Sequence, residues 1–424
     1  MSFLYKNKFK LLLLFIILGS SSPYLYREFQ KYNEQNLYKK LIYTLQDKLE
    51  SAVSSQSIHW PKQIKLGQET YHIQYSLNDD LTNYTRNLLK RYGSDFCAVV
   101  AMENETGRIL TATGVQKGDH RINDRLVFTS THPAASMFKI VTAANLLENS
   151  KIKLQSSFYY RGKGTTLYKY QLKDKKSRYR RSQTFKKAFA YSNNVIFGKA
   201  AINYTNSESL FKTALEMGFN KKLMKELPLS ESILVMPKNE YQLAEIATGF
   251  NRITMISPLH AALISSIVSN KGNLISPKIV DSVVDKNDNL IWRNQKKTKR
   301  VLGEPSALKL EELMKETIWR GTARSSFLGF SRGLKEKIVL GGKTGSLTGG
   351  VPYGKRDWFT SFAYPEGKRK RGISVAVMIV NKDKWHVRSP YIANKVIKYY
   401  FSKIYPQKQS LTDNKDSKKE ENSI

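Results

Sequence analysis

Strand-like runs near both ends of the chain, separated by a mostly helical stretch, restrict the fold more than any other feature of this sequence. The strands are predicted over residues 96–102, 108–113, 338–340, 358–364 and 373–380. Helical spacing dominates residues 70–92, 140–150, 184–275 and 390–401. Strands segregated from helices indicate an α+β fold. We predict a five-stranded antiparallel sheet flanked by helices plus an all-helical lobe, with a functional cleft between them.

The first of three ordered motifs is S-x-x-K, at Ser136 and Lys139. Residues three apart on a helix share one face, so the two side chains should be within reach of each other. A serine hydroxyl becomes a good nucleophile when a neighbouring base removes its proton. A lysine can act as that base when burial and a second cation lower its pKa. Lys343 would be the second cation if its strand lies alongside the helix.

The second and third motifs are S-x-N, at Ser192 and Asn194, and the K-T-G-S run that begins at Lys343. Ser192, in a predicted loop between helices, could relay a proton to a leaving group, and Asn194 could bind Lys139 and a substrate amide. Lys343 and Thr344 suit a substrate carboxylate. Gly345 would let a substrate backbone approach the strand closely.

Backbone N–H groups should complete the site. Those of Ser136 and Ser346 could form an oxyanion hole for the transition state of acyl transfer. No metal-ligand spacing occurs among the six histidines, so we expect neither a metal nor a cofactor. The single cysteine, Cys97, lies in an apolar run and is expected in the core.

Two other motifs compete with this interpretation. A phosphate-binding loop ending at Lys343 and Thr344 would need a glycine at position 337, where the chain has Lys337. A G-x-S-x-G sequence centred on Ser331 is followed by Asp357 and His386, in the order of some hydrolases. That motif needs a buried strand before the serine and a helix after it, and the sequence predicts neither.

The ordered set S-x-x-K, S-x-N and K-T-G is the signature of serine β-lactamases and penicillin-binding proteins. From about Tyr71 to Ile404 the chain resembles the transpeptidase domain of penicillin-binding proteins. Supporting segments are Glu105–Gly107, Ala143–Glu148, Ile256–Leu259, Ser269–Gly272, Gly321–Ala323 and Asp357–Phe359. The chain departs from the family where Ala134 and Ala135 replace the frequent Pro-Gly, and where Ser346 replaces a frequent threonine.

The resemblance implies a peptidoglycan D,D-transpeptidase whose Ser136 attacks the D-Ala-D-Ala carbonyl of a stem peptide, and which β-lactams inhibit covalently. With water as acceptor, the same site would be a D,D-carboxypeptidase. A serine β-lactamase is an alternative, and the segment beginning at Glu226 weakly matches the E-x-x-L-N loop of one β-lactamase class. A non-catalytic β-lactam-binding scaffold or sensor is a further alternative.

The N-terminus combines basic residues with a short apolar run from Leu11 to Leu18. This pattern predicts an N-terminal signal-anchor or a cleaved signal peptide over residues 1–26, with the catalytic domain outside the cytoplasm. A helical stalk or linker is expected over 27–69, the transpeptidase domain over 70–405, and a disordered polar tail over 406–424. We expect a cell-membrane protein that has no room for a glycosyltransferase module, so a separate glycosyltransferase partner is possible.

The net charge of +35 is extreme, and residues 161–187 hold eleven Lys or Arg against Asp174 alone. A second basic cluster covers residues 368–371. No nucleic-acid-binding motif accompanies the charge, and an exported protein does not normally meet nucleic acid. A solvated surface is one interpretation, and contact with an anionic envelope polymer or lipid headgroups is the other.

Overall fold

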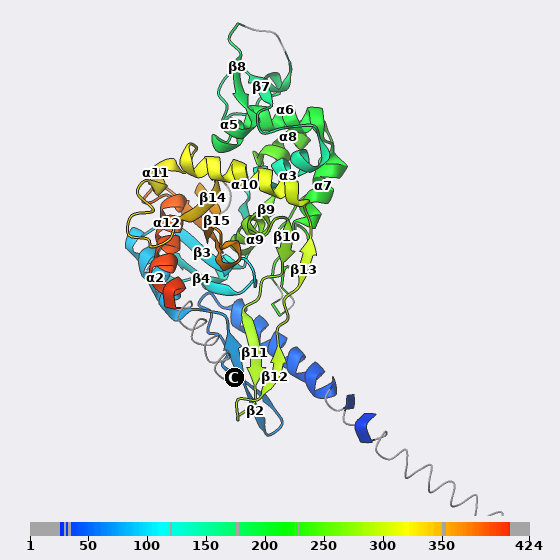
Figure 1. Cartoon of the computed structure of the whole chain (residues 1–424), viewed down its shortest axis with the longest axis vertical. Helices are drawn as coiled ribbons and strands as arrows, with labels where there is room; N and C mark the ends of the chain where they lie inside the picture. Colours follow the sequence, from blue (N-terminus) through cyan, green and yellow to red (C-terminus); the bar gives the residue numbers. More distant parts are fainter. Residues whose placement is uncertain are drawn as a thin grey trace, which may run out of the picture.

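The structure is a computed structural model. It describes residues 26–28, 31–32, 35–118, 121–174, 178–224, 226–227, 229–349 and 353–407. Figure 1 shows a central sheet with helices on its faces, a helical lobe above it and a smaller sheet below it. Residues 1–25 of the predicted signal segment and residues 408–424 of the predicted tail lie outside the described residues. Residues 406 and 407, which were predicted to begin the disordered tail, are helical. Within the described residues, no helix is both long and apolar enough to span a membrane.

The central sheet is antiparallel and contains six strands, so the α+β class is confirmed and the predicted count of five is corrected. Its order is β14 (Ile338–Gly349), β15 (Gly354–Pro365), β16 (Ile373–Asn381), β3 (Phe96–Glu103), β4 (Ile109–Gln116) and β5 (Arg121–Ile122). The missed strand, β5, has two residues, too few to show an alternating pattern. The two ends of the chain join where β16 pairs with β3, as predicted.

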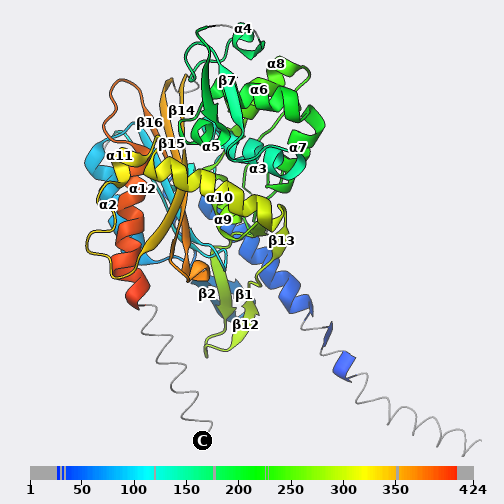
Figure 2. The ribbon, with the colours of Figure 1, turned by 45° about the horizontal axis from the view of Figure 1, so that its top comes forward.

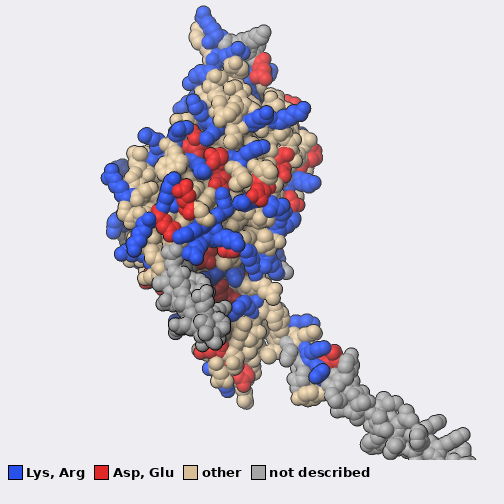
Figure 3. Space-filling model, in the orientation of Figure 1, with Lys and Arg blue, Asp and Glu red and all other residues tan. Residues whose placement is uncertain are grey.

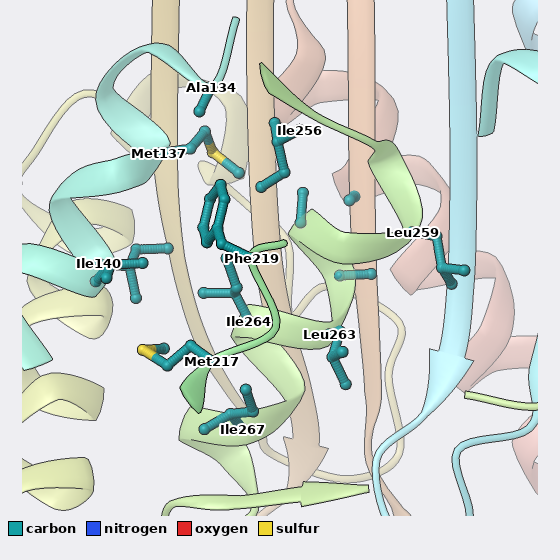
Figure 4. Close-up of a cluster of buried hydrophobic side chains, with 14 of the residues drawn as sticks. Ala134, Met137, Ile140, Met217, Phe219, Ile256, Leu259, Leu263, Ile264 and Ile267 are labelled. Carbon is teal, nitrogen blue, oxygen red and sulfur yellow. The ribbon is translucent and has the colours of Figure 1, made fainter. Parts of the chain in front are cut away.

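Both faces of this sheet are covered, which explains why its strands read as continuous apolar runs. Along β3, Val99 belongs to the cluster under α2 (Asp79–Tyr92) and α12 (Ser389–Tyr399). Val100 belongs to the opposite cluster, under α9 (Pro258–Ser269). Figure 4 shows Met137, Phe219 and Ile264 gathered in this second cluster, between the lobe and α9.

The lobe contains α3 (Lys139–Asn149), α5 (Phe185–Ala190), α6 (Asn194–Tyr204), α7 (Ser207–Glu216) and α8 (Glu240–Thr248). It is not all-helical, because a hairpin of β7 (Ser157–Tyr160) and β8 (Arg181–Thr184) projects from it, with α4 (Lys169–Leu172) in the connection. The prediction missed this hairpin because its four-residue strands flank a long, highly charged connection.

The predicted helix over 70–92 is wrong in its first third. Residues Glu69–Tyr75 form β2, and the helix α2 starts at Asp79, where the Asn78 side chain accepts a hydrogen bond from the Leu81 N–H at 2.8 Å. This N-cap fixes the start of the helix at Asp79, although the helical spacing of apolar residues begins further upstream. The helix ends at Gly93, in the left-handed conformation, as predicted.

Beside β2 lie the other strands of a four-stranded sheet that the sequence did not predict: β1 (Gln63–Leu66), β11 (Val280–Val284) and β12 (Leu290–Arg293). A helix over residues 35–54 also buries its apolar side chains, among them Leu41, Leu45 and Leu49. The remaining strands are β6 (His132–Pro133) with β9 (Met255–Ile256), and β10 (Asn273–Ile275) with β13 (Thr298–Arg300). The remaining helices are α10 (Glu304–Trp319), α11 (Arg324–Phe327), the short 3₁₀ helices η1 (Asp124–Val127), η2 (Ala135–Phe138) and η3 (Arg369–Arg371), and the π-helix η4 (Tyr400–Ile404).

Candidate active site

Ser136 lies in the turn η2, directly before α3. Ala135 has a φ of +49°, a left-handed conformation that is costly for any residue with a Cβ. The turn is held by its surroundings: Trp358 Nε1 donates to the Pro133 carbonyl at 3.0 Å. A Cβ on Gly249 would lie 1.7 Å from the Ala135 carbonyl oxygen, so only glycine allows that close approach. The frequent Pro-Gly of the family is explained here, because glycine adopts this φ without strain.

Lys139 is fully buried and its Nζ has three polar neighbours. It lies 2.8 Å from Ser136 Oγ, 2.6 Å from Asn194 Oδ1 and 2.7 Å from the carbonyl oxygen of Thr248. The Asn194 amide is oriented by its Nδ2, which donates to the Thr165 carbonyl at 2.8 Å. Its oxygen therefore faces Lys139.

Three oxygens could accept the three N–H bonds of a charged ammonium, so the surroundings of the amine decide its protonation state. Burial, and then the positive charge of Lys343, hold the pKa of Lys139 well below its ordinary value of 10.5. A neutral amine has two N–H bonds and one lone pair. The oxygens of Asn194 and Thr248 can only accept, so they take both N–H bonds. The lone pair is left facing Ser136 Oγ, which is the arrangement of a general base and its nucleophile.

The S-x-N motif forms the predicted loop between α5 and α6, with Asn194 as the first residue of α6. Ser192 has a φ of +57°, and its buried Oγ has no hydrogen-bond partner among the described residues. Asn193 caps α6, because its Oδ1 accepts from the Ile196 N–H at 3.1 Å. A strained serine with an unused hydroxyl is placed for a ligand rather than for stability.

The third motif lies on the edge strand β14. Lys343 is fully buried, its Nζ donates to the Thr344 carbonyl at 2.9 Å, and burial lowers its pKa to about 7. A Cβ on Gly345 would lie 3.0 Å from Met137 Cγ, so glycine lets β14 pack against the turn that contains Ser136. Ser346 is exposed, and its Oγ donates to Asp357 Oδ1 at 3.2 Å.

A cavity of about 230 Å³ brings most of the predicted residues together. Ser136, Ser192, Asn194, Thr344 and Ser346 all line it. Lys139, Lys343 and Gly345 are buried behind its wall. The sequence analysis assigned no role to the other lining residues, which are Thr165, Tyr191, Thr248, Gly249, Phe250, Thr322, Leu347 and Arg388.

Two of these missed residues extend the K-T-G motif. Thr322 Oγ1 lies 2.6 Å from Thr344 Oγ1. Arg388 Nε donates to Asp357 Oδ2 at 3.2 Å, so it shares a carboxylate with Ser346. The segment containing Thr322 supported the family resemblance, and that was the available signal. No local pattern marks Arg388.

The competing motifs lie elsewhere. Ser331 is exposed in a turn and His386 is exposed before α12, while Asp357 bonds to Ser346 and Arg388. Glu226 accepts hydrogen bonds from the Ile279 N–H and from Asn294, beside the small sheet, and does not line the cavity of Ser136.

Comparisons with known proteins agree with this geometry. The family model described as the penicillin binding protein transpeptidase domain matches residues 97–398. Stage V sporulation protein D of Bacillus subtilis is 25% identical over 272 residues, which are 61% of this chain and 41% of that protein. The match thus spans less than half the length of this curated relative.

Two solved structures share the fold. The D,D-transpeptidase domain of a peptidoglycan glycosyltransferase from Eggerthella lenta superposes with a TM-score of 0.63 at 20% identity, covering 82% of this chain and 85% of that one. Penicillin-binding protein A from Mycobacterium tuberculosis, as a ceftriaxone acyl-enzyme complex, gives a TM-score of 0.61 at 19% identity, covering 77% and 79%. With the family model matching well over half of its residues, this chain belongs to the penicillin-binding protein transpeptidase domain family.

Proposed function

We propose that this protein is a serine-type peptidoglycan D,D-transpeptidase, which forms cell-wall crosslinks through an acyl-enzyme on Ser136, and that β-lactams acylate the same serine. Family membership supports the proposal, and one observation carries it. Lys139 Nζ lies 2.8 Å from Ser136 Oγ while two carbonyl oxygens occupy its N–H bonds. A neutral lysine held in this way can take the serine proton.

In the acylation step, Lys139 accepts the proton of Ser136, and Oγ attacks the carbonyl carbon between the two D-Ala residues of a stem peptide. The carbonyl oxygen becomes an oxyanion bound by the backbone N–H groups of Ser136 and Ser346. One such donor contributes about 2.7–4 kcal/mol to lowering the barrier. The C–N bond then breaks. Ser192 donates its proton to the leaving D-Ala amine and recovers one from Lys139.

The substrate is held by the groups around this centre. Thr344 and Ser346, on β14, bind the terminal carboxylate, the positive charge of Lys343 behind them attracts it, and Gly345 leaves room for the peptide backbone. Asn194 keeps Lys139 in position and has a second amide N–H for a substrate carbonyl. A β-lactam carries an acyl group and a carboxylate of the same kind, so it reacts at the same serine.

The acyl-enzyme is resolved when the amine of an acceptor stem peptide attacks the ester, returning the proton to Ser136 through Lys139. Water as the acceptor would make the protein a carboxypeptidase. A β-lactamase of the class with an E-x-x-L-N loop needs a carboxylate beside Ser136, and no Asp or Glu is among the described residues that line the cavity. A non-catalytic scaffold typically lacks a catalytic group, whereas all three motifs are complete here.

The same proposal includes the cellular setting. We propose an N-terminal anchor within residues 1–26, an extracytoplasmic catalytic domain over 70–405 and a polar tail over 406–424. The segment over 27–69 connects the anchor to the domain, and its helix and β1 also pack on that domain. A glycosyltransferase that supplies glycan strands is the expected partner.

The test is to map the penicilloyl adduct by mass spectrometry and to digest cell walls made by the wild type and by Ser136→Ala. We expect the adduct on Ser136 and fewer crosslinked dimers with the variant. Lys368→Gln, in the basic cluster at residues 368–371, is a control that should keep both the adduct on Ser136 and the wild-type amount of crosslinked dimers. An adduct on another residue, or rapid hydrolysis of penicillin with no persistent adduct, would contradict the proposal.

A further inference from the structure

The tip of the helical lobe carries a positive and aromatic surface that the proposed chemistry does not use. It consists of β7, β8, the described residues 161–174 and 178–180 of the connection between these strands, which include α4, and the C-terminal end of α6, and we call it the tip surface. Its described residues hold seven of the eleven Lys or Arg of residues 161–187, with Asp174 as the one acid of that stretch. Figure 3 shows Lys and Arg side chains spread over this end of the molecule. Like charges packed this densely repel one another, so the surface is better suited to an anionic ligand than to stability.

A cavity of about 400 Å³ is set into the tip surface, which is within the size range of small-ligand sites. Its walls combine Tyr159, Tyr160 and Tyr204 with Arg161, Arg180 and Lys199. Lys199 is only 6% exposed, and its Nζ donates to the Tyr159 carbonyl and pairs with Asp174. Asp174 also lines the pocket and neutralises Lys199, so Arg161 and Arg180 are the lining cations left for an anionic ligand.

Guanidinium groups stack on tyrosines around the pocket. Arg180 lies 4.2 Å from the ring centroid of Tyr159, which is half exposed. Arg178 lies 4.8 Å from the ring centroid of Tyr179. Flat, exposed rings with polar edges match the apolar C–H faces and hydroxyl rims of sugars, and guanidinium groups bind carboxylates.

The tip surface is joined to the active-site cavity. Arg161, in the pocket wall, donates to the Tyr170 carbonyl at 2.9 Å, and Tyr170 stacks on Tyr168. A few residues before Tyr168, Thr165 lines the cavity of Ser136 and is bonded to Asn194. A polymer lying on the tip surface would thus pass beside the nucleophile.

The position of the tip surface distinguishes between possible anionic ligands. In Figures 1 and 2 the hairpin β7–β8 lies at the opposite end of the molecule from the described N-terminal residues 26–28 and 31–32. With the N-terminus at the membrane, as proposed above, this surface points away from the lipid headgroups. The wall-facing polymer that carries both sugars and carboxylates is the peptidoglycan strand itself.

We propose that the tip surface binds a glycan strand of peptidoglycan, with sugar rings against its exposed tyrosines and stem-peptide carboxylates against its arginines, and so holds the polymer beside Ser136. This inference rests on the proposed function and adds a substrate-binding site outside the catalytic cavity. It also gives the unusual positive charge of this segment a role.

The test is co-sedimentation of the full-length protein, in detergent, with insoluble peptidoglycan. Arg178→Gln with Arg180→Gln should weaken binding about fivefold to thirtyfold, as should Tyr159→Ala. The control, Lys370→Gln with Arg371→Gln, removes two equally exposed charges from the other basic cluster and should bind as the wild type does. Added salt should weaken binding in the wild type more than in the arginine double variant.

Two comparison ligands complete the design. Vesicles of phosphatidylglycerol and a soluble phosphate-linked polymer should each bind more weakly than peptidoglycan and without dependence on Tyr159. Equal losses in the two double variants, or vesicle binding as strong as peptidoglycan binding, would overturn the inference.

Labelling by fluorescent penicillin is measured on every variant, because it reports the active site alone. If the tip variants are labelled normally and bind peptidoglycan as the wild type does, this inference is wrong and the proposed function is unaffected. If the wild type binds peptidoglycan through the tip surface but Ser136 is not acylated, the proposed function is wrong and this inference is supported.

Discussion

Replacing Asn194 by aspartate tests whether Lys139 acts as a neutral base. The substitution keeps the shape of the side chain but puts a negative charge where an amide oxygen now lies 2.6 Å from Lys139 Nζ. Opposite charges at about 4 Å attract with about 4 kcal/mol at the effective dielectric of a protein site, which corresponds to about three pKa units. The pKa of Lys139, which burial and Lys343 now hold low, should rise by about that amount.

The sign of the effect follows from the role of the amine. Acylation needs the neutral form, so its rate rises with pH through the pKa of Lys139 and levels off above it. A higher pKa moves this rise to higher pH. At a pH below both values, Asn194→Asp should therefore acylate about a thousandfold more slowly than the wild type.

The assay is the rate of labelling by fluorescent penicillin as a function of pH, and the midpoint of the rise is the decisive quantity, since a structural defect alone would lower the rate without moving it. Asn193→Asp is the matched control. Its oxygen caps α6 through the Ile196 N–H, a role that aspartate can fill, and it makes no hydrogen bond to Lys139. A midpoint that stays in place in Asn194→Asp, or moves to lower pH, would refute the assignment of Lys139 as the base.

Three further predictions concern the same framework. Gly249→Ala places a Cβ 1.7 Å from the Ala135 carbonyl oxygen at a positive φ, so we expect about 2–4 kcal/mol less stability in urea unfolding and impaired labelling by penicillin; unchanged values would contradict the described packing. Lys343 loses its proton as pH rises through about 7, so the rate of acylation by penicillin should fall above that pH. A penicillin ester, which has no carboxylate, should show no such fall. A fall in rate with both compounds would argue against attraction of the carboxylate by Lys343. Arg369→Met leaves the buried Glu311 without its cation and should lower the free energy of unfolding by about 2–3 kcal/mol, less than for a fully buried pair because Arg369 is 26% exposed; equal stability would show that the pair contributes little.

Much of the fold could be predicted because the relevant patterns are local. The long strands of the central sheet and the helices α3 and α12 appear in the sequence as apolar runs and periodic spacing. The short strands did not, because two to five residues carry too little pattern. The helix predicted over 70–92 failed because the strand β2 acquires its stability from pairing with β11, more than two hundred residues away.

Part of the candidate site could also be predicted from local sequence. Ser136 and Lys139 are one helical turn apart, so their proximity follows from local geometry. Thr322 and Arg388 reach the cavity only through the packing of other elements. The family resemblance of Gly321–Ala323 was the one signal for Thr322, and no local pattern marks Arg388. Gly249 is likewise required because the backbone of Ala135, which is distant in the sequence, packs directly against it.

What the sequence alone determined is the list of reactive groups and their order, since a hydroxyl, two amines and an amide are properties of the residues themselves. Only the tertiary structure decided the protonation state of those groups and the partners of their hydrogen bonds. The oxygens that occupy Lys139 come from positions 55 and 109 residues away, and its burial depends on the whole lobe. A pKa responds to surroundings in space and not to neighbours in the chain, and for this reason the reactivity of the serine emerges only on folding.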